Sequence, residues 1–244
     1  MLEVFEVFEV TNDLVSRIEE VLGRGLCVGR GDSSSQMCVE TAVCFAMRLN
    51  SDNPPSVGGG VMSFIITLND ANWPNAFERA AGMRKLAIAQ LGSDTLNQFK
   101  FAHRLREKTI RVLVPALFRE VFKDNEACLE AAKVCENCAD IEEGAQATSA
   151  ASTTALAQLA NVTGYDMSPA RAANEAACAT TRDFTRSLGI EGVTRASNWG
   201  VYAAARAAEV AGNKYLILSA ELCFQVLDEM DSPGAVWMRE NNWQ

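Results

Sequence analysis

Apolar side chains recur every three to four residues along most of this chain, a spacing that predicts amphipathic helices. The clearest segments are residues 14–23, 75–93 and 96–122. We expect Asn12 to cap the first of them. We expect Gly92 to end the second, and Pro115 to kink or split the third.

Residues 36–50 are apolar on nearly every side, which predicts a central helix that Ser34 or Ser35 caps. Residues 51–60 contain two prolines and three glycines and are expected to form a connector. The β-branched run 61–70 has no obvious partner strand, so it predicts either a short helix or an extended segment.

From about residue 125 the chain becomes rich in alanine, which favours helices that approach closely. Further helices are expected near 125–138, 140–162, 168–188, 193–210 and 216–230, the last ended by Ser232-Pro233-Gly234. The predicted fold is an all-α multi-helix bundle in one domain, 1–244. Within it, a loop-bearing half (1–124) precedes an alanine-rich helical layer (125–244).

Charge narrows the function classes. The 22 Lys and Arg residues against 31 Asp and Glu give a net charge of -9, which argues against a protein that coats nucleic acid generally. The N-terminus is acidic, and no apolar run approaches membrane-spanning length. We therefore expect a protein without membrane contact, located in the cytoplasm, with its eight cysteines reduced.

Several segments together resemble a family of uncharacterised alanine-rich helical proteins from bacteriophages and bacterial genomes. They are MCVETAVCFAMRL, LNDANWPN, AAGMRKLAIAQLGSDTL, the alanine-rich tract and SPGAVW. The resemblance implies a phage or mobile-element setting, and hence the host cytoplasm if the chain is phage-encoded. It transfers no activity and no catalytic residue.

Cys38 is the candidate catalytic nucleophile, because it follows a serine- and glycine-rich loop and opens a predicted helix. A helix N-terminus favours the thiolate. A cysteine hydrolase or transferase also needs a base, and His103 is the only histidine. Because His103 lies in a charged helical stretch, we do not expect it to be catalytic. The alternative is that Cys38 and Cys44 are buried packing residues.

Cys128, Cys135 and Cys138 are candidate metal ligands, since they fall on one side of a predicted helix. A zinc site would need a fourth ligand, and its C-x2-C pairs normally lie on tight turns. Packing is the favoured interpretation, and we expect neither a metal nor another cofactor.

Two features could bind a small anion such as a nucleotide. The glycine-rich loop offers backbone N–H groups together with Arg24, Arg30 and Ser34. The second feature is a basic stripe on one helix, with Phe101, Leu105 and Val112 expected on the opposite side. The stripe consists of Lys100, Arg104, Lys108 and Arg111. The alternatives are a plain connector and a solvated helix face.

Glu40 is an isolated carboxylate in the apolar segment 36–50. Burying it without a partner would be costly, so we expect an ion pair with Arg30 or Arg84. Such a pair would hold the glycine-rich loop on the core. The alternative is a carboxylate beside Cys38 in a ligand pocket.

Three functions remain open. The favoured one is a non-enzymatic helical binding protein, as a phage accessory or counter-defence factor that sequesters a host protein or a nucleotide signal. The second is a thiol hydrolase or transferase that uses Cys38. The third is a structural module whose alanine-rich helices form a homo-oligomer.

Overall fold

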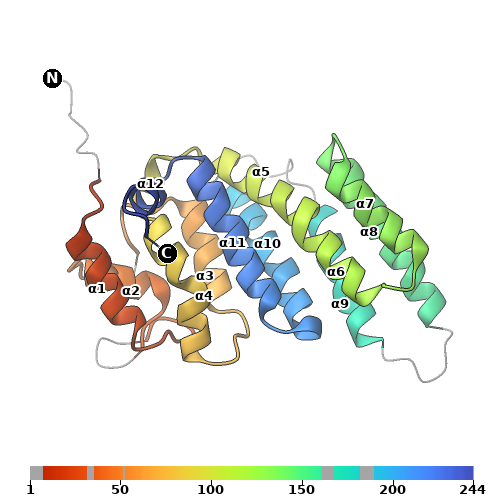
Figure 1. Cartoon of the computed structure of the whole chain (residues 1–244), viewed down its shortest axis with the longest axis horizontal. Coiled ribbons are helices and arrows are strands. Elements are labelled where there is room, and N and C mark those ends of the chain that lie inside the picture. Colours follow the sequence, from red (N-terminus) through yellow and green to blue (C-terminus); the bar gives the residue numbers. More distant parts are fainter. Residues whose placement is uncertain (1–7, 32–35, 52, 161–166, 182–189, 244) are drawn as a thin grey trace. The chain divides into compact units, whose positions relative to one another are not determined.

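The structure is a computed structural model that describes residues 8–31, 36–51, 53–160, 167–181 and 190–243. Within these ranges the regular elements are helices, and extended pairing is limited to isolated bridges of Met37 with Leu26 and with Gly31. Figure 1 shows coiled ribbon along nearly all of this chain. The predicted all-α, multi-helix class is confirmed.

The chain divides into two compact units, and the division differs from the change in sequence texture near residue 125. The first unit contains Met1–Phe101 together with Cys223–Gln244, and the second contains Ala102–Leu222. The second unit is therefore an insertion in the first. The prediction of a single domain with halves 1–124 and 125–244 stays a prediction. The boundaries between the compact units fall at other positions in the sequence, after Phe101 and after Leu222.

The first unit is built from short helices around a core that includes Ile18, Leu26, Phe64 and Met83. Its helices are α1 (Asn12–Leu22), α2 (Val39–Ala46), α3 (Gly59–Asn69), α4 (Ala76–Ala89) and α12 (Pro233–Glu240). The β-branched run 61–70, for which the sequence left two options, is helical in α3.

The second unit contains the alanine-rich helices, and its successive members α6 to α10 pack against one another. They are α6 (Val114–Val121), α7 (Glu126–Asn137), α8 (Ile141–Leu159), α9 (Ser168–Thr181) and α10 (Ile190–Ala211). These bounds lie close to the four predicted alanine-rich segments. Several alanines of α9 and α10 are fully buried, among them Ala173, Ala177, Ala203 and Ala207. Their small side chains allow these two helices to pack closely.

Two helices carry the chain across the division, α5 (Gln98–Lys108) and α11 (Lys214–Glu229). A π-helical turn, Thr109–Leu113, joins α5 to α6. Pro115 accounts for this turn: it has no N–H for the carbonyl of residue 111, and its ring crowds that carbonyl. The sequence predicted a kink or a split at Pro115, but the helical run is unbroken from residue 98 to residue 121, with the π-helical turn inside it.

Local side chains set several helix starts. Thr11 caps α1 by accepting from the N–H of Leu14 at 3.2 Å, so the predicted cap at Asn12 was wrong by one residue. Asn75 caps α4, accepting from the N–H groups of Phe77 and Glu78. Asn125 and Asp140 cap α7 and α8 in the same way. These bonds satisfy donors that have no partner inside a helix.

The prediction that Ser232-Pro233-Gly234 ends the last helix was incomplete. These residues also begin α12, with Pro233 in its first turn. Proline is favoured there, because its fixed φ suits the helix and its missing N–H would be unpaired in any case.

Candidate functional site

An open groove of about 320 Å³ lies on the first unit, where the end of α11 meets α12 and the residues that follow it. Apolar, aromatic and polar side chains all contribute to its lining. Its lining residues are Phe224, Asp228, Ala235, Met238, Arg239, Asn242 and Trp243. This mixture of apolar surface with a few polar groups is typical of a binding site.

The position of α12 depends on two small residues. The hydroxyl of Ser232 donates to the carbonyl of Ala89 at 2.7 Å, and the N–H of Gly234 donates to the carbonyl of Leu91 at 2.9 Å. A Cβ atom on Gly234 would lie 1.9 Å from the carbonyl oxygen of Ile88. Only glycine allows this approach, so α12 is held against the C-terminal end of α4.

Two cations from α4 lie on aromatic rings of this groove. The guanidinium of Arg84 is 4.2 Å from the ring centroid of Trp243, and the ammonium of Lys85 is 5.1 Å from that of Phe224. Arg84 also donates to both carboxylate oxygens of Glu19 on α1, at 2.9 Å each. These contacts position Trp243 beyond the end of α12.

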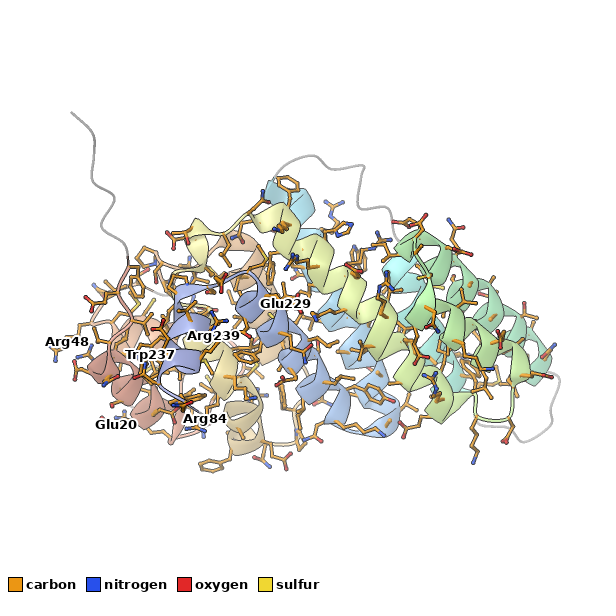
Figure 2. The ribbon with its side chains drawn as sticks, turned by 45° about the horizontal axis from the view of Figure 1, so that its top comes forward. Glu20, Arg48, Arg84, Glu229, Trp237 and Arg239 are labelled. Atoms are coloured by element: carbon orange, nitrogen blue, oxygen red, sulfur yellow. The ribbon has the colours of Figure 1, made fainter. Side chains whose placement is uncertain are left out.

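Two of the residues that line the groove are charged, Asp228 and Arg239. Arg239 on α12 bonds to Asp228 at 2.7 Å and to Asp231 at 2.8 Å (Figure 2 labels Arg84, Trp237 and Arg239 on this unit). Glu229 and Glu240 are exposed nearby in sequence. Residues 228–240 thus hold four carboxylates and one guanidinium, a net charge of -3.

Cys38 lies at the N-cap of α2 rather than inside the helix. Its sulfur accepts from the N–H of Thr41 at 3.5 Å and lies 3.1 Å from the Thr41 hydroxyl oxygen. Cys38 belongs to the first unit and His103 to the second, so neither unit by itself contains both groups of the suggested thiol enzyme. That activity stays a prediction.

Several N–H groups of the glycine-rich loop donate to the chain itself. The N–H of Gly29 donates to the carboxylate of Asp70 at 3.0 Å. Arg24 pairs with Glu20 at 2.8 Å, and Arg30 is exposed. Ser34 lies outside the described residues. The N–H of Gly29 is therefore taken up by an internal carboxylate, and anion binding by Arg24, Arg30 and Ser34 stays a prediction.

Sequence reasoning missed the two residues that anchor this loop. The Arg79 side chain is buried, and it donates to the carbonyls of Asn69 at 2.8 Å and Leu26 at 2.9 Å. Asn69 in turn donates to the carbonyl of Cys27 at 2.9 Å. An arginine among apolar residues of a helix was the available signal, since buried backbone carbonyls need donors.

The predicted basic stripe is interrupted. Lys100 is exposed, and Arg104 and Lys108 are half-buried on α5. Arg111 falls in the π-helical turn, where it pairs with Glu107 at 3.0 Å. Phe101 and Leu105 are buried as expected, but Val112 is 41% exposed, so its predicted direction was wrong. The wider turn shifts the phase of the helix after residue 109.

A buried arginine that sequence reasoning passed over lies on the same helix. Arg106 is only 9% exposed and forms a two-pronged ion pair with Glu142 in the first turn of α8. Arg106 is therefore the cation of α5 that the fold holds in place through a two-pronged ion pair.

The three cysteines suggested as metal ligands are buried. Cys128 and Cys135 are fully buried and Cys138 is 7% exposed. The thiol of Cys135 donates to the carbonyl of Gly144 at 3.0 Å. Burial raises the pKa of both the Cys128 and the Cys135 thiol to about 11. In the part of the chain described, no three His, Cys, Asp or Glu side chains are grouped so as to hold a metal ion.

Glu40 is buried, but the prediction that Arg84 pairs with it was wrong. Arg84 bonds to Glu19, and the partner of Glu40 is the carboxamide of Gln90 at the end of α4. With its nitrogen facing Glu40, this amide donates to the two carboxylate oxygens at 2.8 and 3.3 Å. Burial raises the pKa of Glu40 to about 8.

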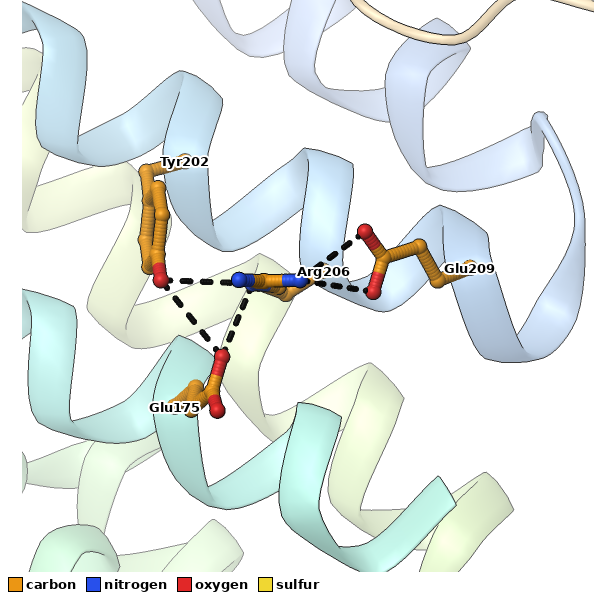
Figure 3. Close-up of polar contacts among 4 residues, drawn as sticks. All are labelled: Glu175, Tyr202, Arg206 and Glu209. Carbon is orange, nitrogen blue, oxygen red and sulfur yellow. Dashed lines mark hydrogen bonds and ion pairs between the residues drawn. The ribbon is translucent and has the colours of Figure 1, made fainter. Parts of the chain in front are cut away.

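The second unit has one extended polar network on its surface. Arg206 on α10 bonds to Glu175 at 2.8 Å and to Glu209 at 2.9 Å, and it also donates to the Tyr202 hydroxyl (Figure 3). The hydrogen bond to Tyr202 is the largest cause that raises the pKa of Arg206. The guanidinium is charged at any physiological pH, so this network links α9 to α10 without a titratable function.

Comparison with known proteins adds no assignment: no family model matches the chain, and no curated protein or solved structure is significantly similar to it. Among the helices described, none is long and apolar enough to cross a membrane.

Proposed function

We propose that this chain is a non-enzymatic binding protein that engages a partner protein through the groove beside α12. The observation that carries the proposal is the groove itself, which the half-buried rings of Phe224 and Trp243 line above the buried side chain of Met238. Aromatic residues of this kind, in a pocket with a polar rim, dominate binding energy at protein interfaces.

Charge determines the class of partner. The net charge of -3 over residues 228–240 is larger in magnitude than the two positive charges of Arg84 and Lys85, which lie on the rings of the groove. This excess of negative charge favours a segment with Lys or Arg beside its apolar anchor. A nucleotide fits this groove less well, because Arg84 and Arg239 already bond to carboxylates. The resemblance of the sequence to phage proteins supports a host protein as the partner.

Selection from a displayed random-peptide library tests this proposal with a defined probe. The full chain should enrich peptides that carry a large apolar residue flanked by Lys or Arg. Trp243→Ala should weaken the best synthetic peptide by about tenfold or more, equivalent to about 1.4 kcal/mol. Trp199→Phe, in the second unit, is the matched control and should bind like the wild type.

Salt and charge changes separate a specific contact from general attraction. Binding should weaken as ionic strength rises, and a version of the peptide with Glu in place of Lys should bind much less tightly. Failure to enrich any peptide above background would overturn the proposal. So would peptides that bind Trp243→Ala and the wild type equally.

A further inference from the structure

Met37 lies between two other segments of the glycine-rich loop. It forms a parallel bridge with Leu26 on one side and an antiparallel bridge with Gly31 on the other. The N–H of Cys27 donates to the carbonyl of Met37 at 3.0 Å, and the N–H of Cys38 donates to the carbonyl of Arg30 at 3.3 Å. The backbone around Met37 is therefore fixed from both sides.

This pairing brings two cysteines together. In parallel pairing, the residues that follow a bridged pair are neighbours on the same face. Here those residues are Cys27 and Cys38. Neighbouring strands are about 4.8 Å apart, and disulfides join residues whose Cα atoms are about 4.4–6.8 Å apart.

The electrostatics of the two thiols agree with this placement. Burial is the largest cause that raises the pKa of Cys27, and the negative charge of a Cys38 thiolate is the next. This charge effect is consistent with the proximity that the backbone pairing gives.

We propose that Cys27 and Cys38 form a reversible disulfide site, oxidised by a low-molecular-weight disulfide such as oxidised glutathione. The Cys27 thiolate attacks one sulfur of the oxidant, breaks its S–S bond and releases one reduced thiol. The Cys38 thiolate then attacks the Cys27 sulfur and releases the second. The protein loses two electrons and two protons, and the oxidant becomes two thiols.

Accessibility assigns the order of these steps. Cys27 is half-buried, whereas Cys38 is 9% exposed, so an external disulfide meets Cys27 first. Cys178 is the other half-buried thiol, and its sulfur lies beside Ser149 and Asn174. The remaining cysteines are buried, and all eight are free thiols in the structure.

The crosslink would tie the loop to the start of α2. The carbonyl of Cys27 is held by Asn69 on α3, and the sulfur of Cys38 caps α2 through Thr41. Oxidation would therefore join covalently two segments that backbone hydrogen bonds alone now connect, and it would close residues 27–38 into a ring.

The experiment exposes the native full-length chain to glutathione buffers of increasing oxidation, followed by acid quench, alkylation and peptide mass spectrometry. The expected result is a single internal disulfide that joins the peptides containing Cys27 and Cys38, with the loss of both from alkylation. Excess dithiothreitol should restore both thiols. This readout on the wild type needs no variant.

Variants then test the order of attack. Cys38→Ser should accumulate Cys27 as a stable mixed disulfide with glutathione, and Cys27→Ser should leave Cys38 unmodified. Cys178→Ser is the control and should oxidise like the wild type, with far-UV circular dichroism confirming that each variant is folded. Stable glutathionylation of Cys27 in the wild type, without the internal crosslink, would overturn the proposal. A disulfide that involves another cysteine would overturn it equally.

Discussion

The carboxyl group of Glu40 faces the carboxamide of Gln90 inside the first unit, and this contact replaces the ion pair that the sequence suggested. An amide can bond to either protonation state of a carboxyl group after rotating, but it cannot neutralise a charge. Glu40 therefore keeps its proton to about pH 8, because burial disfavours the charged form.

This raised pKa makes the stability of the protein depend on pH. In the unfolded chain Glu40 loses its proton near its ordinary pKa of 4.5, whereas in the fold it keeps the proton to about pH 8. Between these two pH values the folded state binds more protons than the unfolded state. The contribution of Glu40 to the free energy of unfolding therefore falls as pH rises. The slope is at most about 1.4 kcal/mol per pH unit, and it levels off above the folded pKa.

Glu40→Gln should remove this pH dependence. Urea unfolding can be followed by tryptophan fluorescence at pH 5, 7 and 9. From pH 5 to pH 9, the free energy of unfolding of the variant is expected to rise by several kcal/mol relative to that of the wild type. Glu78→Gln, an exposed change at the start of α4, is the control. Parallel pH profiles for Glu40→Gln and the wild type would show that Glu40 does not titrate in this window.

The case of Glu40 also marks what the sequence can reveal. Its burial followed from the apolar residues around it, but its partner did not. Gln90 is far away in the chain, and a buried amide leaves no charge pattern to match. Likewise, the groove depends on where α12 meets α4, through a serine and a glycine that look like an ordinary helix stop.

Most helices were predictable because alanine content, apolar spacing and caps agree with one another in the segments from residue 125 onward. The errors fall where one signal has two meanings. Proline at position 233 starts a helix as well as ending one, and the π-helical turn before Pro115 shifts the spacing that had placed Val112 inward.

Replacing Gly234 should detach α12 from α4. A Cβ atom there would meet the backbone of Ile88, which cannot move aside as a flexible side chain can. Gly234→Ala should lower the free energy of unfolding by about 1–3 kcal/mol, the usual cost of overpacking. Differential scanning fluorimetry measures the change.

Gly59→Ala provides the matched control, because a Cβ atom at Gly59 has open space around it. This change at the first residue of α3 should leave the melting temperature unchanged or raise it slightly, since alanine restricts the unfolded chain. Equal losses in the two variants would show that α12 does not depend on close contact at Gly234.

Removal of the carboxylate at Glu142 should destabilise the second unit. Arg106 would then remain buried without its charged partner, and breaking such pairs costs on the order of 1–3 kcal/mol when one side is partly exposed. Glu143→Ala is the control, since Glu143 is exposed in the same first turn of α8. Chemical denaturation should give a lower midpoint for the Glu142 variant than for Glu143→Ala. Similar midpoints would contradict a stabilising role for the ion pair of Arg106 with Glu142.

Alkylation should distinguish packing from metal binding at Cys128 and Cys135 in α7 and Cys138 at its C-cap. At pH 8, iodoacetamide should modify Cys128 and Cys135 in the native protein at least about a hundredfold more slowly than in urea, because a pKa of about 11 leaves little thiolate. A chelator should not change the native rates. Acceleration of Cys128, Cys135 and Cys138 together by a chelator would indicate a metal site.

The order in which the chain leaves the ribosome bears on how the first unit forms. Residues 1–101 are made before the second unit, but α12, which packs on α4, is made after it. The surface at the end of α4 must therefore wait uncovered while the whole of the second unit is synthesised. The second unit is one continuous segment of the chain, so it can fold before the first unit is complete. The groove can form only after the residues up to Trp243 have been synthesised.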